Sequence, residues 1–208
     1  MGPGEEGMSL PRCLFLDIGQ VLVRLDYQPL AGKMRALAGI EPAQLQALLT
    51  AENLVQRYET GKVTEAEFHE EVCRRIGAGI PQDAFFEAWY SIFGPSLIPD
   101  ACLATLAQRV PLWALSNTNR LHFEYMMRRY DLFRHFAGFV LSHEVGFLKP
   151  DERIFRIALA KVRASAQEVL FVDDQETNVS AAQALGIDAF RFVNSDQFAA
   201  ELQARGVL

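Results

Sequence analysis

Short apolar runs alternate along this chain with segments whose apolar residues recur every three or four positions. Three of the runs are four residues long, at residues 13–16, 112–115 and 169–172. Uninterrupted runs of this length predict parallel strands that are buried on both faces, and the periodic segments between them predict helices. The pattern therefore predicts an α/β fold with a doubly wound parallel sheet.

The second half of the chain continues the alternation of strand and helix. Besides the runs already named, strands are expected over residues 138–141 and 187–192. Helices are expected between the strands, over residues 119–130, 151–160 and 176–185, with a closing helix that begins at Ser195. A ladder of this kind predicts a Rossmann-like core with helices on both faces of the sheet.

The first half of the chain contains a stretch that is too long for one crossover helix. Asp17 and Ser116 are separated by 98 residues, and this stretch shows helix signals without strand patterns. Four helices are expected in it, over residues 29–38, 42–50, 64–76 and 81–91. Proline lies near the first turn of three of them, and Thr64 with Glu67 forms a capping box.

This excess predicts a small α-helical cap over residues 27–93, inserted after the first strand. The α/β core would then comprise residues 11–26 and 94–208, with hinges at 23–27 and 93–99. Such a cap can close over a bound substrate and exclude water from it.

Four polar clusters follow apolar runs of the core. They are Asp17, Ser116-Asn117, Lys149 and Asp173-Asp174. An open α/β sheet binds its ligand at the carboxyl ends of its strands, so the clusters should meet in one crevice. An Asp carboxylate can attack phosphorus, two acidic positions can hold Mg²⁺, and lysine with neutral donors can bind phosphate oxygens. The clusters together predict a site for a phosphoryl group carried on a divalent cation.

Each cluster also has an ordinary structural interpretation. An Asp at the end of a strand often caps the next helix, and a Ser-Asn-Thr-Asn segment often forms a turn. The adjacent pair Asp173-Asp174 fits this interpretation poorly, because like charges side by side repel unless a cation or base offsets them.

The sequence resembles the haloacid dehalogenase (HAD) superfamily from Arg12 onward. The likeness rests on four motifs in order, at residues 14–22, 115–119, 146–151 and 171–174, with Asn178 and Gly186 behind the last. The opening motif and residues 115–122 are most similar to bacterial phosphatases of the α-D-glucose-1-phosphate phosphatase group. The resemblance implies a HAD core with a helical cap and a Mg²⁺-dependent hydrolase that cleaves a small phosphomonoester, with a sugar phosphate favoured.

The resemblance also implies catalytic and phosphate-binding roles. Asp17 is expected to be the nucleophile, which forms an aspartyl-phosphate. Lys149 is expected to be catalytic, as the charge that holds nucleophile and phosphate together. Ser116 and Asn117 are expected to bind the phosphate with it.

The same resemblance implies a set of metal ligands. Asp17 and Asp174 are expected to bind Mg²⁺ directly through their carboxylates. Gly19 is expected to contribute its backbone carbonyl oxygen. Asp173 is expected behind these ligands or bound to the metal through water.

Gly19 also marks a departure from the family pattern, because most phosphatases of this superfamily carry a second Asp there. Without that carboxyl, no side chain in the motif protonates the leaving oxygen, a role worth roughly 10² to 10⁴ in rate. Gln20 or water is expected to assist if the leaving group scarcely requires a proton. Arg24, Asp26 and Tyr27, close behind the nucleophile, are expected to contact the substrate with Gln20.

Two other functions remain open at this stage. The chain could have kept the fold and lost useful turnover, as a regulatory protein that binds a phosphorylated ligand. It could also be a 2-haloacid dehalogenase, which attacks with an Asp but needs no metal. The pair Asp173-Asp174 would then be a liability.

Composition narrows the classes of partner. The chain has 208 residues, half of them hydrophobic, and its formal charge is −6. No basic run exceeds two residues, so nucleic acid and anionic membrane are not expected as partners. Three scattered cysteines without metal spacing are typical of a cytoplasmic protein. Residues 1–10 are expected to be a flexible extension, and the enzyme is expected to be a monomer or homodimer acting on a small phosphorylated metabolite.

Overall fold

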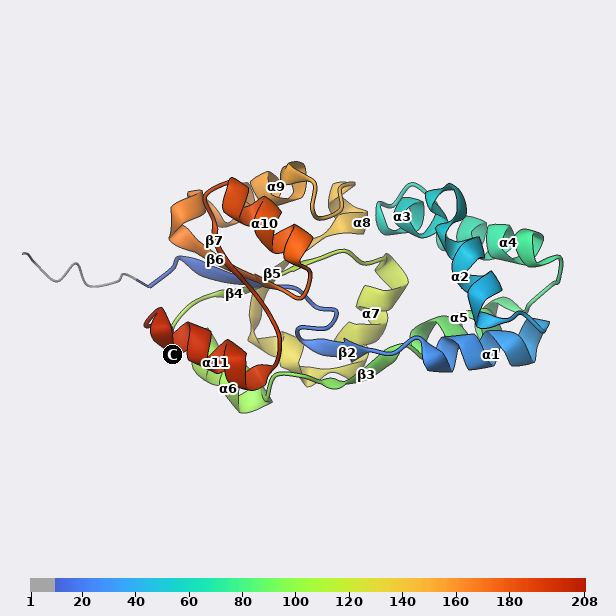
Figure 1. The fold of residues 1–208 in the computed structure, drawn as a ribbon, viewed down its shortest axis with the longest axis horizontal. Coiled ribbons are helices and arrows are strands. Elements are labelled where there is room, and N and C mark those ends of the chain that lie inside the picture. Colours follow the sequence, from blue (N-terminus) through green and yellow to red (C-terminus); the bar gives the residue numbers. More distant parts are fainter. Residues whose placement is uncertain (1–9) are drawn as a thin grey trace, which may run out of the picture.

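The computed structural model describes residues 10–208 and is built around a five-stranded parallel sheet in the order β5-β4-β1-β6-β7 (Figure 1). All four neighbouring pairs are parallel. The strands are β1 (Cys13–Leu16), β4 (Leu112–Ser116), β5 (Phe136–Leu141), β6 (Val169–Asp173) and β7 (Asp188–Arg191). The predicted doubly wound α/β fold is therefore confirmed. The extension expected over residues 1–10 lies, apart from Leu10, outside the described residues.

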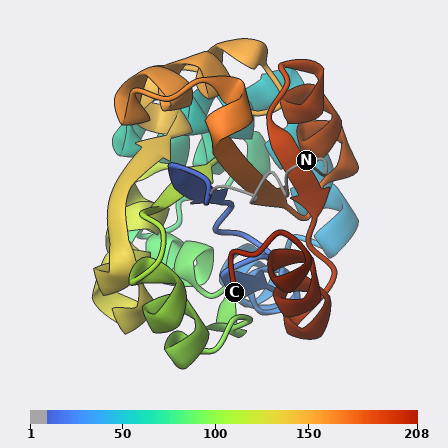
Figure 2. The same cartoon turned by 90° about the vertical axis from the view of Figure 1, so that its left-hand side faces the viewer.

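Helices cover both faces of this sheet, as the end-on view in Figure 2 shows. One face packs against α6 (Asp100–Ala107), α7 (Arg120–Arg129) and α11 (Ser195–Ala204), and the other against α9 (Glu152–Val162) and α10 (Glu176–Ala184). Side chains of a strand alternate between faces, so Leu14 and Leu16 enter the first layer and Cys13 and Phe15 the second. Because both faces of the sheet are covered by apolar side chains, polar side chains of these strands can lie only at the strand ends.

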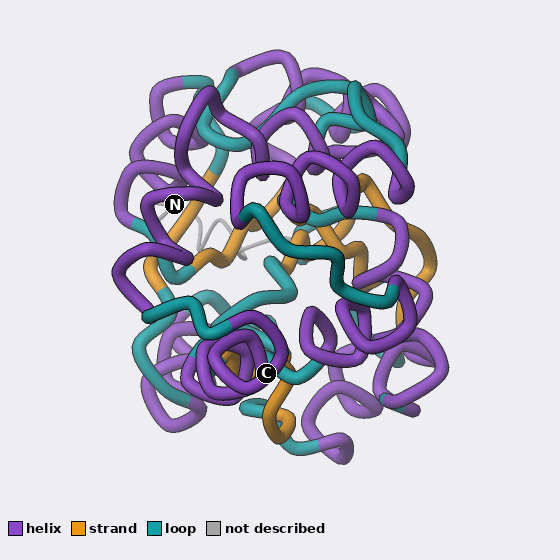
Figure 3. The backbone as a smooth tube through the Cα atoms, turned by 90° about the vertical axis from the view of Figure 1, so that its right-hand side faces the viewer, coloured by secondary structure: helices purple, strands orange, loops and turns teal. Residues whose placement is uncertain are grey.

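Five helices between β1 and β4 form the cap, which faces the viewer in Figure 3. They are α1 (Gln28–Ala38), α2 (Pro42–Thr50), α3 (Leu54–Glu59), α4 (Glu65–Ile76) and α5 (Gln82–Tyr90). They enclose an apolar core of their own, in which Phe68 packs against Tyr58 and Trp89. The four helices predicted here are present with ends within one residue of those expected.

Helix α3 was not predicted. It has only six residues, and its N-cap residue Asn53 is in the left-handed region and makes no side-chain cap hydrogen bond. The usual start signal is therefore absent from the sequence. Other short elements are α8 (Ser142–Val145) and the 3-10 helices at Ala51–Asn53, Asp131–His135 and Ala166–Glu168.

An antiparallel ribbon joins the cap to the core. It consists of β2 (Val23–Leu25) and β3 (Phe93–Ser96), which lie in the two segments expected to act as hinges. The cap also touches the core at its far end, where α3 lies beside α8 (Figure 1). Across this boundary Arg120 Nε donates to Glu65 Oε1 at 2.7 Å. The cap is thus held over the carboxyl edge of the sheet from both sides.

No helix within residues 10–208 combines the length and apolar character needed to cross a lipid bilayer.

Replacing Phe155 with alanine is expected to destabilise the core. The Phe155 side chain is buried between α9 and the sheet, with its ring edge-on to Phe171 at 5.4 Å between centroids. Removing a buried ring costs about 3–5 kcal/mol of unfolding free energy. Urea unfolding should show this loss, whereas Met127→Ala, on an exposed position of α7, should cost less than about 0.5 kcal/mol. Similar losses in both variants would contradict the packing described.

Candidate active site

The polar clusters singled out in the sequence meet at the carboxyl edge of the sheet. Asp17 directly follows β1, Ser116 ends β4 and Asp173 ends β6. Lys149 lies in the loop before α9, with Nζ 2.8 Å from Asp17 Oδ1 and 2.6 Å from Asp173 Oδ2. The structure therefore brings an attacking carboxylate, an ammonium group and a second carboxylate into direct contact.

The Lys149 ammonium is enclosed by acceptors. Its Nζ also donates to the Leu115 carbonyl at 2.8 Å, and the residue is buried. Burial alone would lower the pKa of Lys149, but the charges of Asp17 and Asp173 outweigh it, so that the pKa is raised. The group therefore remains a cation at neutral pH.

The Asn117 side chain holds Lys149 in place. Its Nδ2 donates to the Lys149 carbonyl at 2.9 Å, and its Oδ1 accepts from the Lys149 N–H at 2.8 Å. Both ends of the Asn117 side-chain amide therefore take part in this clamp. The neighbouring Ser116 is buried and lines a cavity that lies between this edge of the sheet and the cap.

Asp17 lies in an environment that opposes its charge. Burial raises the pKa of its carboxyl, and attraction to Lys149 offsets only part of that effect. The nearby Asp173 raises the pKa further. A divalent cation beside Asp17 would reverse this balance, because it is the largest charge such a site can hold.

The acidic residues at this edge fit a hydrated divalent cation. Carboxylate oxygens of Asp17, Asp173 and Asp174 all lie within 4.8 Å of one another. Asp173 is already occupied, because Oδ1 accepts from the Gln175 N–H and Asn178 Nδ2 while Oδ2 binds Lys149. Asp174 is only partly buried, and within residues 10–208 its carboxylate accepts no hydrogen bond from another residue. Asn178 Oδ1 is buried without a partner among the described residues, which a metal-bound water would satisfy.

The space above Gly19 is taken by Leu25. A Cβ at Gly19 would lie 2.8 Å from Leu25 Cδ1, so this side chain stands where an acid at position 19 would begin. Gln20 has a left-handed backbone (φ 57°), and its amide donates to the Leu25 carbonyl and accepts from the Leu25 N–H. Gln20 borders the cavity, but its polar atoms serve this turn.

The other residues expected to contact the substrate lie in different places. Tyr27 lines the cavity over Asp17. Arg24 lines a neighbouring hollow together with Gln20 and Asp174. Asp26 lines neither space, and its Oδ1 accepts the Gln28 N–H at 2.9 Å, so its carboxylate serves the turn that leads into α1.

A cavity of about 520 Å³ lies between the polar edge and the cap. Its floor is polar, with Asp17, Ser116 and Lys149 among the lining residues. Its walls are largely apolar and include Leu25, Leu30, Leu49, Val55, Ile92 and Met126. This size suits a small organic ligand whose polar end meets the sheet.

Glu59 is a cavity residue that sequence reasoning missed. It is the last residue of α3, and its side chain lines the cavity opposite Asp17. Burial and the charge of Asp17 raise the pKa of Glu59 to about 7. The only sequence signal was Gly61 two residues later, because a glycine turn after a helix marks a tight approach.

His122 also lines the cavity, but its ring nitrogens are used in structural hydrogen bonds. Its Nδ1 accepts from Asn119 Nδ2 at 3.1 Å, and its Nε2 bonds the Trp89 carbonyl of the cap at 3.2 Å. Burial lowers the pKa of His122 to about 3, so the ring is neutral. It joins α7 to α5 across the cap boundary.

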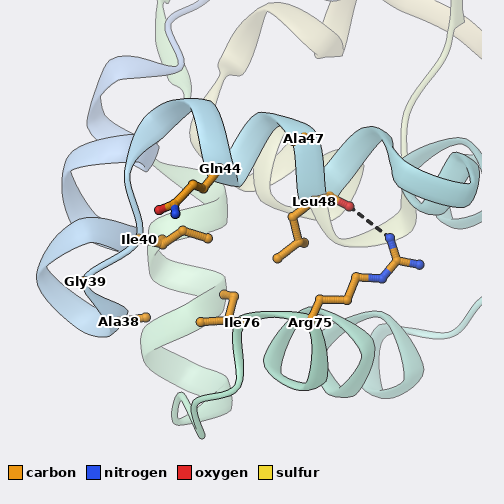
Figure 4. Close-up of a pocket in the computed structure, with 8 residues that line it drawn as sticks. All are labelled: Ala38, Gly39, Ile40, Gln44, Ala47, Leu48, Arg75 and Ile76. Carbon is orange, nitrogen blue, oxygen red and sulfur yellow. Dashed lines mark hydrogen bonds between the residues drawn. The ribbon is translucent and has the colours of Figure 1, made fainter.

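A second hollow lies within the cap, between α2 and the end of α4 (Figure 4). Arg75 is the charged residue in its lining, and its guanidinium donates to the carbonyls of Leu48 and Ala51 and pairs with Glu52 and Glu71. These bonds fasten α4 to α2, which gives Arg75 a structural role.

Glu59→Gln is expected to stabilise the metal-free protein at high pH. The folded protein keeps a proton on Glu59 that the unfolded chain loses above pH 4.5, so rising pH destabilises the fold until about pH 7. Glutamine removes this cost, which is on the order of 1–3 kcal/mol. Urea unfolding in EDTA should show no difference at pH 4 and a more stable variant at pH 8. Glu70→Gln, at an exposed cap position, is the control; the same response in both variants would refute the assignment.

Three curated proteins are similar to this chain. A drimenol cyclase of Aspergillus calidoustus is 27% identical over 92% of the chain, which spans only 36% of that longer protein. A sesquiterpene phosphatase of Aspergillus oryzae is 27% identical over 67% of the chain and 72% of its own length. A D-ribitol-5-phosphate phosphatase of Bacteroides thetaiotaomicron is 25% identical over 72% of the chain and 76% of its own length.

Solved structures show the same fold. An HAD family enzyme of Bacteroides thetaiotaomicron, in complex with magnesium and inorganic phosphate, superposes with a TM-score of 0.79. The two are 24% identical, and the match covers 88% of this chain and 95% of the other. The sequence model of the haloacid dehalogenase-like hydrolase family matches residues 12–186 of this chain, as the four motifs predicted. This chain therefore belongs to the haloacid dehalogenase-like hydrolase family.

Proposed function

We propose that this protein is a Mg²⁺-dependent phosphomonoesterase that works through an aspartyl-phosphate on Asp17. The observation that carries the proposal is the buried Lys149 ammonium, which contacts the carboxylates of Asp17 and Asp173 at 2.8 and 2.6 Å beneath an open cavity. A regulatory protein without turnover would not require this charge arrangement around a nucleophile. A dehalogenase would gain nothing from Asp174 beside it.

Asp17 begins the reaction by attacking phosphorus with a carboxylate oxygen. Lys149 donates to the phosphate oxygens while it holds Asp17 in position, and the Ser116 hydroxyl and the Asn117 N–H donate to the same group. Asp17, Asp174 and the Gly19 carbonyl oxygen would hold Mg²⁺, which would supply positive charge to offset that of the phosphate and of Asp17. Asp173 would lie behind these ligands, held by Lys149, Gln175 and Asn178.

The cavity walls favour a substrate with an apolar body. Leu30, Leu49, Val55 and Ile92 offer a bound molecule no hydrogen bonds, so a polyol would lose its hydration without compensation. An alkyl or isoprenoid chain would instead gain from burial. The sesquiterpene phosphatase among the relatives acts, by its name, on a substrate of this kind.

A sugar phosphate is the second candidate substrate. The segment from Leu115 to His122 resembles that of the sugar phosphatases, and one relative is a D-ribitol-5-phosphate phosphatase. Tyr27 and Glu59 are the cavity groups that could bind its hydroxyls. A cytoplasmic location goes with either substrate, and three free cysteines support it.

Asp17→Asn is expected to abolish phosphate release. The amide cannot attack phosphorus, and it removes the partner of Lys149, so the rate should fall by at least about 10³. Phosphate release from a panel of monoesters should also stop in EDTA and return on adding Mg²⁺. Release by Asp17→Asn at the normal rate, or undiminished release in EDTA, would refute the mechanism.

The dependence of kcat/KM on chain length in a homologous series of alkyl phosphates tests whether the substrate contacts the apolar walls. Each methylene buried in the cavity contributes about 0.8 kcal/mol, so kcat/KM should rise about fourfold per carbon until the cavity is filled. Leu49→Asn should flatten this rise without changing the rate for the shortest ester. Faster turnover of ribitol 5-phosphate than of any alkyl phosphate would favour the sugar phosphate instead.

A further inference from the structure

Apart from Asp17 and Asp174, the described core residues that line the cavity offer no carboxylic acid to the leaving group. Position 19 is glycine, and the Leu25 side chain occupies the space next to it. Gln20 uses its amide on the Leu25 backbone. His122 is neutral and bonded at both ring nitrogens. A proton for the leaving oxygen must therefore come from elsewhere in the cavity.

Glu59 faces this gap from the cap side. Its carboxyl lines the cavity that also contains Asp17, Ser116 and Lys149. Within residues 10–208 the Glu59 carboxyl accepts no hydrogen bond and pairs with no cation. Its pKa is shifted only by burial and by the charge of Asp17. A partly buried carboxyl with a raised pKa, in the same cavity as a nucleophile, is a candidate for a catalytic role.

The fold fixes where Glu59 lies. Gly61, two residues later, has a left-handed backbone, and a Cβ there would come within 2.5 Å of the His143 carbonyl oxygen of α8. Only glycine permits this approach between cap and core. The nearby pair between Glu65 and Arg120 closes the same boundary. The end of α3 is therefore anchored at the rim of the site, next to the carboxyl edge.

We infer that Glu59 is the proton donor and acceptor of the hydrolysis, supplied by the cap in place of an acid at position 19. This inference rests on the phosphomonoesterase activity proposed above. It assigns a catalytic role to the cap, in addition to enclosing the substrate.

The two half-reactions then balance. Asp17 attacks phosphorus, the bond from phosphorus to the ester oxygen breaks, and that oxygen takes the Glu59 proton and leaves as an alcohol. Glu59, now a carboxylate, takes a proton from a water molecule whose oxygen attacks the phosphorus of the aspartyl-phosphate. The bond from phosphorus to the Asp17 oxygen breaks, which frees phosphate and the Asp17 carboxylate. Glu59 ends protonated, ready for the next substrate.

Burial raises the pKa of Glu59 to about 7, which suits both steps near neutral pH. The charge of Asp17 bears directly on Glu59, and the charge of Glu59 in turn raises the pKa of Tyr27, which lines the same cavity. Because α3 belongs to the cap, the proton is available only while the cap lies on the core.

The test compares two substrates in Glu59→Gln. An alkyl phosphate needs a proton on its leaving oxygen, whereas p-nitrophenyl phosphate releases a stable phenolate. The variant should lose about 10² to 10⁴ in kcat/KM for the alkyl ester and less than about tenfold for the nitrophenyl ester. With the nitrophenyl ester it should also show a burst of one phenolate per active site followed by slow turnover, because aspartyl-phosphate hydrolysis lacks its base.

Glu70→Gln is the matched control, since Glu70 is an exposed glutamate on the next cap helix. It should leave both substrates and the burst unchanged. Equal losses for both substrates in Glu59→Gln, or a change confined to KM, would show that Glu59 positions the substrate or the cap, and would overturn the inference. So would unchanged kinetics. If the wild type and Asp17→Asn were equally inactive on every ester, the proposed phosphatase would fail instead, and the inference with it.

Discussion

The site depends on one buried ion cluster, in which the Lys149 ammonium is held between Asp17 and Asp173. Three charges removed from water are tolerable only because each has a partner and the remaining lone pairs and protons are bonded. The Leu115 carbonyl, the Asn178 amide and the Gln175 N–H supply those bonds. The parallel sheet makes the cluster possible, because its strand ends converge where its apolar faces stop.

These hydrogen bonds distinguish the two members of the acidic pair Asp173-Asp174. Asp173 is fully bonded to Lys149, Gln175 and Asn178, so the proposed metal ligand is its neighbour Asp174. The Asn117 clamp on the Lys149 backbone has a similar effect, because it places the lysine before any phosphate arrives. Preorganised groups of this kind cost no rearrangement during the reaction, which is the main source of electrostatic catalysis.

In the proposed reaction, the cap supplies a reacting group as well as covering the substrate. Its contact with the core is narrow at Gly61, where backbone meets backbone, and is completed by Arg120 and Glu65. The same segment presents Glu59 to the cavity, opposite the nucleophile. Leu25, which fills the space above Gly19, belongs to the ribbon that carries the cap. The ribbon that places Leu25 next to Gly19 thus leads into the domain that carries Glu59.

The sequence by itself determined the parallel sheet, four of the five cap helices and the meeting of Asp17, Ser116, Lys149 and Asp173. These follow from local signals, since apolar runs specify strands and polar residues at strand ends must share one edge. Only the tertiary structure decided what lies above that edge. Helix α3 has no start signal, and Glu59 looks like any surface glutamate until Gly61 brings it against the core. Its role depends on packing between segments far apart in the chain, and such packing leaves no periodic pattern in either one.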